Sequence, residues 1–224
     1  MTPDALPYSP RLLSRQERDR EDVYLLHSPK VAREASVIGP LRLAFWLEQE
    51  FTSHTSHIIE RPRSLTLADG RSMELDFWTR SVTGHETFWI AVSAEETISA
   101  DRELTSKDHP QWQRAAQLAG IHVGFVFEHD LHQRAQRVAN HLHMLPYVQA
   151  LRRQNTSSQA IMAVKDLFSH GAFSLSFAQI DDNLSPALDS VGRMAACALV
   201  HSGWLRYDES LPLTPQTRLH REQS

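Results

Sequence analysis

Two strand-like runs on either side of a Thr-Gly turn constrain the fold of this chain more than any other feature. The first run extends from Met73 to Trp78 and the second from Phe88 to Val92, with Thr83-Gly84 between them. Short apolar and aromatic runs around a glycine turn are typical of a β-hairpin. Because side chains alternate along a strand, Glu74 and Asp76 are expected on the same face. The segment therefore predicts a hairpin that carries acidic side chains.

The segments around this hairpin predict an α/β sandwich. Apolar residues with helical spacing begin after Pro40 and continue to Phe51, and a second helix is expected over Asp108 to Gly120. Strands are expected at His57–Glu60, Ser64–Leu67 and Ile121–Phe127, with a turn at Ala68–Arg71. A further helix is expected from Glu128 to Asn140. The order helix, antiparallel strands, helix, strand predicts a mixed sheet flanked by helices.

The two ends of the chain predict separate parts. Residues 1–30 are rich in proline and charge and predict an extended N-terminal arm, so the α/β domain is expected over residues 31–150. A polar break at Arg152–Ser158 separates a C-terminal domain over residues 155–224. Three short helices are expected there, followed by a hairpin between Trp204–Tyr207 and Pro212–Thr214. This is the order of a winged-helix domain.

Composition excludes several classes of function. The net charge of −4 gives no overall basic surface for nucleic acid, so any DNA contact is expected to be local. No apolar run is long enough to span a bilayer and the N-terminus lacks a signal pattern, so we expect a cytoplasmic protein with no membrane partner. The single cysteine, Cys197, is expected to be a small buried residue. The 13 histidines match no zinc motif, and no glycine-rich nucleotide loop occurs.

A series of scaffold positions runs along residues 36–147: Ser36, Glu50-Phe51, Arg61-Pro62, Leu75-Asp76-Phe77, Trp112, Gly120-Ile121, Phe127-Glu128, Asn140 and Leu145-Pro-Tyr147. In these positions the segment resembles the TnsA-type endonucleases of heteromeric transposons. In that family a restriction-endonuclease-like fold holds Mg²⁺, and the enzyme cuts the non-transferred strand beside a transposase and an AAA+ ATPase. The resemblance implies DNA, the transposase and the ATPase as partners, and a C-terminal domain that contacts these proteins.

The departures from the family pattern decide the expected activity. Gly39 stands where the family has a glutamate, and Ala91 and Ser93 stand where it has an acid-x-lysine motif. Asp76 is left as a vestigial catalytic residue, and one carboxylate is a weak site for Mg²⁺. We therefore expect a catalytically inactive structural or regulatory subunit that needs no cofactor.

Two alternatives remain open. In the first, the chain is an active Mg²⁺-dependent nuclease whose site has moved to other carboxylates of the same region: Glu48, Glu50, Glu74, Glu95 and Glu96. The charge role of the missing lysine, and contact with DNA, would then fall to arginines: Arg61, Arg63, Arg71 and Arg80. In the second, the chain is a winged-helix DNA-binding regulator. The segment 187–200 has only Arg193 as a basic residue, so it is expected to be a core and protein-binding helix.

Overall fold

The chain divides into two structural units, which are described separately. The computed structural model describes residues 6–100, 103–169, 173–184 and 189–221. Unit 1 comprises Met1–Gln49 with His54–Gln133, and unit 2 comprises Glu50–Ser53 with Arg134–Ser224. Unit 2 thus begins before the predicted boundary at residues 150–155. The reason is tertiary, because α5 (Ala135–Leu151) packs on α8 (Asp189–His201) of unit 2.

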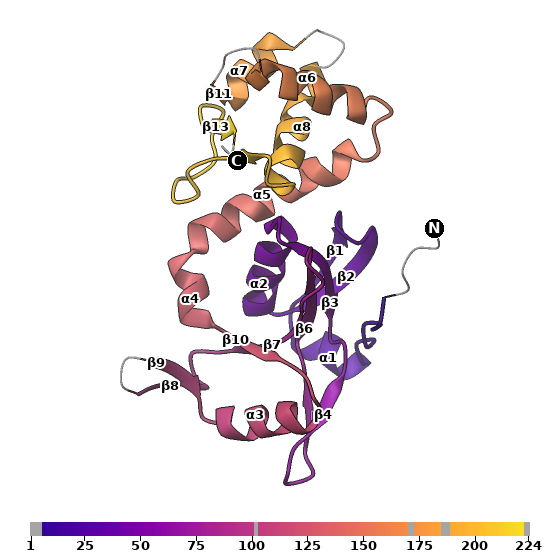
Figure 1. Ribbon diagram of the computed structural model, residues 1–224, viewed down its shortest axis with the longest axis vertical. Coiled ribbons are helices and arrows are strands. Elements are labelled where there is room, and N and C mark those ends of the chain that lie inside the picture. Colours follow the sequence, from indigo (N-terminus) through magenta and orange to yellow (C-terminus); the bar gives the residue numbers. More distant parts are fainter. Residues whose placement is uncertain (1–5, 101–102, 170–172, 185–188, 222–224) are drawn as a thin grey trace. The chain divides into compact units, whose positions relative to one another are not determined.

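A four-stranded mixed sheet organises unit 1 (Figure 1). Its strands are β3 (Thr55–Glu60), β6 (Phe77–Ser81), β7 (Glu86–Val92) and β10 (Val123–Phe127), in the order β10-β7-β6-β3. β3, β6 and β7 run antiparallel, whereas β10 runs parallel to β7. The helix α3 (His109–Leu118) lies between β7 and β10 in the sequence, and a parallel pair requires such a crossover. The predicted α/β class and mixed sheet are confirmed.

Alternation of side chains along the strands builds an apolar layer on each face of this sheet. On one face Trp78 and Phe88 join a buried cluster with Trp112, Ala115 and Ala116 of α3. Phe77 and Trp89, each one residue further along its strand, meet Phe45 of α2 (Pro40–Phe51) on the other face. The ring centroid of Phe45 lies 5.3 Å from that of Phe77 and 5.1 Å from that of Trp89. Period-two alternation therefore gives both helices an apolar surface to cover.

Smaller hairpins extend from the sheet. β4 (Ser64–Thr66) pairs with β5 (Ser72–Glu74), and β8 (Thr97–Ala100) pairs with β9 (Glu103–Ser106). The predicted turn between β4 and β5 is confirmed, since Gly70 has φ 84° and donates its N–H to the carbonyl of Leu67 at 3.0 Å. The short helix α4 (Glu128–Gln133) directly follows β10.

The N-terminal residues differ from the predicted extended arm. They contain a helix, α1 (Arg15–Arg20), and a strand, β1 (Val23–Ser28), which pairs antiparallel with β2 (Arg33–Ile38). Ser14 and Glu17 form a capping box at the start of α1. The arm prediction is wrong for this part because local capping and a hairpin supply backbone hydrogen bonds that composition does not reveal.

Unit 2 is a group of helices beside a three-stranded sheet. It contains α5 and α8 together with α6 (Ser157–Ser169) and α7 (Phe177–Asn183). The sheet has the order β11-β13-β12, formed by β11 (Ser174–Ser176), β12 (Leu205–Arg206) and β13 (Arg218–Arg221). The predicted strand at Pro212–Thr214 is wrong, and β13 pairs with β12 instead. Pro212 has no N–H to donate, whereas fully buried Leu219 anchors β13.

Two further predictions concern the burial of Cys197 and the presence of membrane-spanning helices. Cys197 is buried in α8, and burial raises the pKa of its thiol to about 12, as expected for a core residue. In the part of the chain that the structure describes, no helix has the length and apolar character to cross a bilayer.

Candidate functional site

Asp76 lies between β5 and β6, with a hydrogen-bond partner on each carboxylate oxygen. Oδ1 accepts from Nε of Arg42, with which it forms an ion pair. Oδ2 accepts from the backbone N–H of Ala91 at 2.7 Å. Arg42 belongs to the first turn of α2, and Ala91 belongs to β7. Two elements of unit 1 thus fix this carboxylate at the N-terminal end of β6, an inner strand of the sheet.

Electrostatics couple Arg42 to more than one carboxylate. Burial lowers the pKa of the Arg42 guanidinium, but attraction to Asp76, followed by Glu21 and Glu96, outweighs it and leaves the pKa raised. Burial raises the pKa of the Asp76 carboxyl, and Arg42 and the Ala91 N–H oppose that shift. The guanidinium therefore supplies the positive charge that a buried aspartate requires.

The local backbone favours a glycine at Gly39, where the resembled family has glutamate. Its φ is +73°, a left-handed conformation that costs a side-chain-bearing residue roughly 1–2 kcal/mol. The Gly39 N–H donates to the carbonyl of Asp22 at 2.9 Å, and its carbonyl accepts from Leu43 of α2. A Cβ at this position would lie 3.7 Å from Oε2 of Glu21. The Glu21 carboxylate thus lies in contact distance of the space that a side chain at position 39 would occupy.

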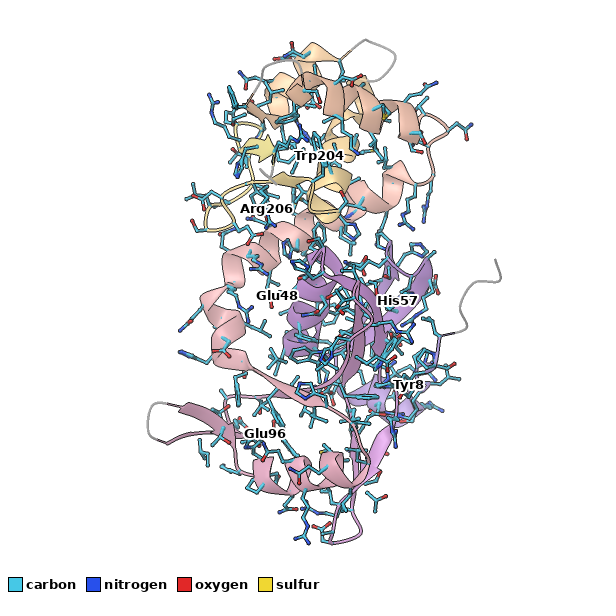
Figure 2. The ribbon with its side chains drawn as sticks, viewed as in Figure 1. Tyr8, Glu48, His57, Glu96, Trp204 and Arg206 are labelled. Atoms are coloured by element: carbon cyan, nitrogen blue, oxygen red, sulfur yellow. The ribbon has the colours of Figure 1, made fainter. Side chains whose placement is uncertain are left out.

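The other two substituted positions also have structural partners. The Ala91 side chain is 6% exposed and faces the cavity beside Asp76. Ser93 donates its N–H and its hydroxyl to Oε2 of Glu96, at 3.1 and 2.8 Å. Glu96, labelled in Figure 2, therefore lies beside the position of the family's lysine. A serine that donates to a glutamate cannot supply the positive charge of that lysine.

Asp76 lines a cavity of about 240 Å³ within unit 1. Its wall combines apolar residues such as Val37, Ile90 and Trp112 with many charged ones. The charged lining residues are Glu17, Glu21, Arg42, Glu60, Arg61, Glu74, Asp76 and Glu96. The guanidiniums of Arg42 and Arg61 are the positive groups in this lining, so the cavity is predominantly acidic.

A segment near the N-terminus contributes part of this cavity. Tyr8 packs edge-on against Trp78 and Phe88, with ring centroids 5.4 and 5.2 Å apart (Figure 2). Arg11 pairs with Glu74 of β5 and with Glu17 of α1. The segment from Leu6 to Glu21 is thus held on unit 1 by aromatic and ionic contacts, and it brings Glu17 and Glu21 to the cavity.

Replacing Tyr8 with alanine is expected to lower the free energy of unfolding of unit 1 by about 1–2 kcal/mol, because two aromatic contacts are lost. It is also expected to speed tryptic cleavage at Arg15 and Arg18. Urea unfolding and timed proteolysis measure the two effects. Leu12→Ala is the matched control, since Leu12 is 86% exposed. Equal cleavage rates for both variants would show that Tyr8 does not hold the segment.

The structure brings together only part of the carboxylates proposed for a relocated site. Glu48 is 3% exposed and Glu50 is fully buried; Glu50 belongs to unit 2, where its Oε1 lies 3.0 Å from Nε2 of His201. Glu74 is paired with Arg11, and exposed Glu95 is absent from the cavity lining among the described residues. Of the proposed set, only Glu74 and Glu96 join Asp76 at the cavity.

This arrangement does not fit a resident Mg²⁺. The ion needs oxygen ligands in octahedral geometry, usually including more than one carboxylate or phosphate. Both oxygens of Asp76 already have donors, and one of these is a cation. Within the described ranges, no group of three or more His, Cys, Asp or Glu side chains has the spacing of a metal site.

The four arginines predicted to contact DNA have different environments. Arg61 is 5% exposed, with φ 46°, and donates to the Ser36 carbonyl and hydroxyl and to the Arg11 carbonyl, so its placement does not suit a DNA contact. Arg80 pairs with Glu86 and lies over the Trp78 ring, and Arg71 pairs with Asp69. Arg63 is exposed.

Sequence reasoning identified Asp76 but missed Arg42, Tyr8 and Arg11. Arg42 was the one detectable case, because it interrupts the apolar pattern between Leu41 and Leu43 at the start of a buried helix. Comparison of the chain with protein-family models and with curated protein sequences gives no match.

Proposed function

We propose that this chain is a TnsA-like component of a DNA transposition complex that lacks nuclease activity and serves as a structural or regulatory DNA- and protein-binding subunit. The observation that carries the proposal is the position of Arg42. Its guanidinium forms an ion pair with the Asp76 carboxylate. In a nuclease of this type that carboxylate would bind a metal cation instead. Gly39, with its positive φ, adds a backbone reason why the family's glutamate is absent.

The order of elements supports the fold part of the proposal. In unit 1 the order is helix α2, antiparallel strands β3, β6 and β7, helix α3, and parallel strand β10, as expected for a restriction-endonuclease-like domain. In unit 2, helices α6, α7 and α8 precede the β12–β13 hairpin, as expected for a winged-helix-like domain.

The properties of α8 argue against base reading. Its described side chains are mostly buried, including Val191, Ala195 and Leu199, and its arginine, Arg193, pairs with Asp181 at 2.7 Å. A helix that reads DNA bases must instead expose polar side chains to the major groove. This argues against an independent winged-helix regulator.

One observation favours an active nuclease as the second candidate. Glu21 and Glu96 both attract the Arg42 guanidinium electrostatically. Together with Asp76, three carboxylates therefore act on this one side chain. Displacement of Arg42 by DNA or by a partner would leave these acids for Mg²⁺. A cleavage assay separates the two candidates.

The purified chain is expected to leave branched and duplex DNA uncut in Mg²⁺ or Mn²⁺, within the background set by its Asp76→Ala variant. The readout is the appearance of cut strands on a denaturing gel, with an active restriction nuclease as the positive control for the buffer. Metal-dependent cutting that disappears in Asp76→Ala would reject the inactive assignment. The gene neighbourhood tests the proposed role in a transposition complex, since genes for a transposase and an AAA+ ATPase are expected beside this one.

A further inference from the structure

Two histidine rings meet at one end of the sheet of unit 1. His85 lies in the turn between β6 and β7, and His122 directly precedes β10. Their ring centroids are 5.8 Å apart, and the ring planes are inclined at 54°. Both residues are exposed. We call these two side chains the histidine pair. They are far apart in the sequence, so the spacing of histidines along the chain does not indicate it.

The parallel pairing of β7 and β10 brings the two side chains to the same face of the sheet (Figure 1). Val123 of β10 is opposite Phe88 of β7, which places His122 level with Thr87. Side chains that are in register across two strands share a face, and so do residues two apart along one strand. His122 and His85 are therefore diagonal neighbours on one face, close enough for their rings to meet.

Backbone hydrogen bonds position both histidines and leave their rings accessible. The carbonyl of His85 accepts from the N–H of Ser81 at 2.8 Å, and the N–H of His85 donates to the Ser81 hydroxyl at 3.0 Å. The carbonyl of His122 accepts from the N–H of Phe88 at 2.9 Å. Among the described residues, the ring nitrogens of the pair have no hydrogen-bond or ion-pair partner. These nitrogens are therefore available to a ligand.

The separation of the two rings suits a single metal ion between them. A neutral imidazole presents one unprotonated nitrogen, which binds an ion such as Zn²⁺ at about 2.0–2.1 Å. The ion then lies roughly 3.2 Å from each ring centroid, so two rings on one ion have centroids at most about 6.4 Å apart. The 5.8 Å of the histidine pair is within this limit. Rotation of two exposed side chains is enough to turn a nitrogen of each ring toward the ion.

We propose that the histidine pair binds one divalent transition-metal ion of the Zn²⁺, Ni²⁺ or Cu²⁺ class. Imidazole suits these ions, whereas Mg²⁺ prefers oxygen ligands. Within the described ranges, no third His, Cys, Asp or Glu side chain joins the two rings, so water fills the remaining positions. The site is therefore open and binds more weakly than a closed structural zinc site. Neither histidine lines the cavity at Asp76, so the proposal is independent of the proposed function.

The bound ion links β10 to the turn before β7. β10 is an end strand in the order β10-β7-β6-β3, with β7 as its one neighbour in this sheet. An ion that binds the folded chain and not the unfolded chain shifts the unfolding equilibrium toward the folded state. At an ion concentration ten times the dissociation constant, this shift is about elevenfold. The ion therefore acts as a clip on unit 1.

The test measures binding of NiCl₂ to the full chain by isothermal titration calorimetry, in a buffer that does not coordinate metals. The strongest site is expected to weaken at least tenfold in His85→Asn and in His122→Asn, because either substitution leaves one ligand. His85→Asn/His122→Asn should lose no more affinity than either single variant, since the two rings act as one unit. Thermal unfolding with NiCl₂ should show a rise in Tm for the wild-type chain that these variants lack, and MgCl₂ should give no rise.

His132→Asn/His143→Asn is the matched control. It also removes two exposed histidines, and in the part of the chain that the structure describes neither of them has a ring contact with another histidine. This variant is expected to keep the wild-type affinity and the rise in Tm. Circular dichroism without metal checks folding, and the two positions of the pair lie on different elements, so each single variant tests the site separately.

Three results would overturn the proposal. These are wild-type affinity for Ni²⁺ in His85→Asn and His122→Asn, an equal loss of affinity in the control, or independent losses that add in the double variant. Dimerisation that requires Ni²⁺ would also overturn it, because the ion would then join two chains instead of two strands. The DNA cleavage assay concerns other residues, so its outcome and the outcome of this test are separate.

Discussion

Replacing Arg42 with methionine is expected to lower the free energy of unfolding of unit 1 by about 2–3 kcal/mol at pH 8. The substitution leaves the Asp76 carboxylate, whose side chain is 10% exposed, without its counter-ion. Removing one partner of a buried pair commonly costs about 3–5 kcal/mol, and we place this case lower because the Arg42 side chain is 37% exposed. Urea unfolding followed by tryptophan fluorescence reports unit 1, which contains Trp46, Trp78, Trp89 and Trp112.

The same variant has an expected pH dependence. In the wild-type chain, burial already raises the pKa of the Asp76 carboxyl, and loss of Arg42 removes the main opposing attraction. The folded variant therefore binds a proton at a higher pH than the unfolded chain does. Its deficit relative to wild type should be largest at pH 8 and shrink as pH falls through the raised pKa. Asp76→Asn in the Arg42→Met background should recover part of the lost stability at pH 8.

An exposed ion pair provides the matched control. Arg71→Met removes the pair with Asp69, in which the two side chains are 60% and 45% exposed, and is expected to leave stability unchanged within error. If Arg42→Met cost no more than Arg71→Met, the guanidinium would not be the group that stabilises Asp76. The main structural support for an inactive site would then be lost.

Local patterns predicted most of the sheet and much less of the site. The hairpin of β6 and β7, the helix α3 and the strand β10 follow from periodicity and glycine turns, which are properties of neighbouring residues. The β1–β2 hairpin was missed because Leu25 is 79% exposed and its strand shows no clear apolar face. The unit boundary was misplaced because the membership of α5 depends on its packing against α8.

The candidate site shows the same limit at the level of single residues. Asp76 was visible as an acid within an apolar hairpin, but its partner Arg42 lies 34 positions earlier, and only the fold brings the two together. Arg61 was a reasonable DNA contact from its charge, yet its φ of 46° and its three hydrogen bonds turn it inward. Positive φ is uncommon outside glycine, and arginine is not among the residue types enriched there, so the sequence does not signal it at Arg61.

A histidine is expected to make unit 2 sensitive to acid. His141 is 3% exposed and stacks on Phe51 with ring centroids 4.4 Å apart, and its Nδ1 atom has no hydrogen-bond partner among the described residues. Burial, with smaller contributions from Arg137 and His201, lowers its pKa to about 3. Between its ordinary pKa of about 6.5 and this value, the unfolded chain binds a proton that the folded chain does not.

Because the unfolded chain binds this additional proton, the folded state of unit 2 loses stability as the pH falls. Lowering the pH from 7.5 to 5 should reduce the free energy of unfolding of unit 2 by about 2 kcal/mol through His141 alone, because each pH unit below 6.5 costs about 1.4 kcal/mol. His141→Phe keeps a ring against Phe51 and should remove this component, so its stability should fall less between the two pH values. Urea unfolding followed by far-ultraviolet circular dichroism measures the helical signal at both pH values.

The change in the free energy of unfolding between the two pH values distinguishes the effect of His141 protonation from the effect of altered packing. Phenylalanine is larger than histidine, so overpacking can change the stability of His141→Phe, but by nearly the same amount at pH 7.5 and at pH 5. His143→Phe makes the same substitution at an exposed position two residues along α5, and should retain the wild-type slope. A wild-type slope in His141→Phe would place the acid-sensitive group elsewhere, and the buried ring of His141 would then be a packing element only.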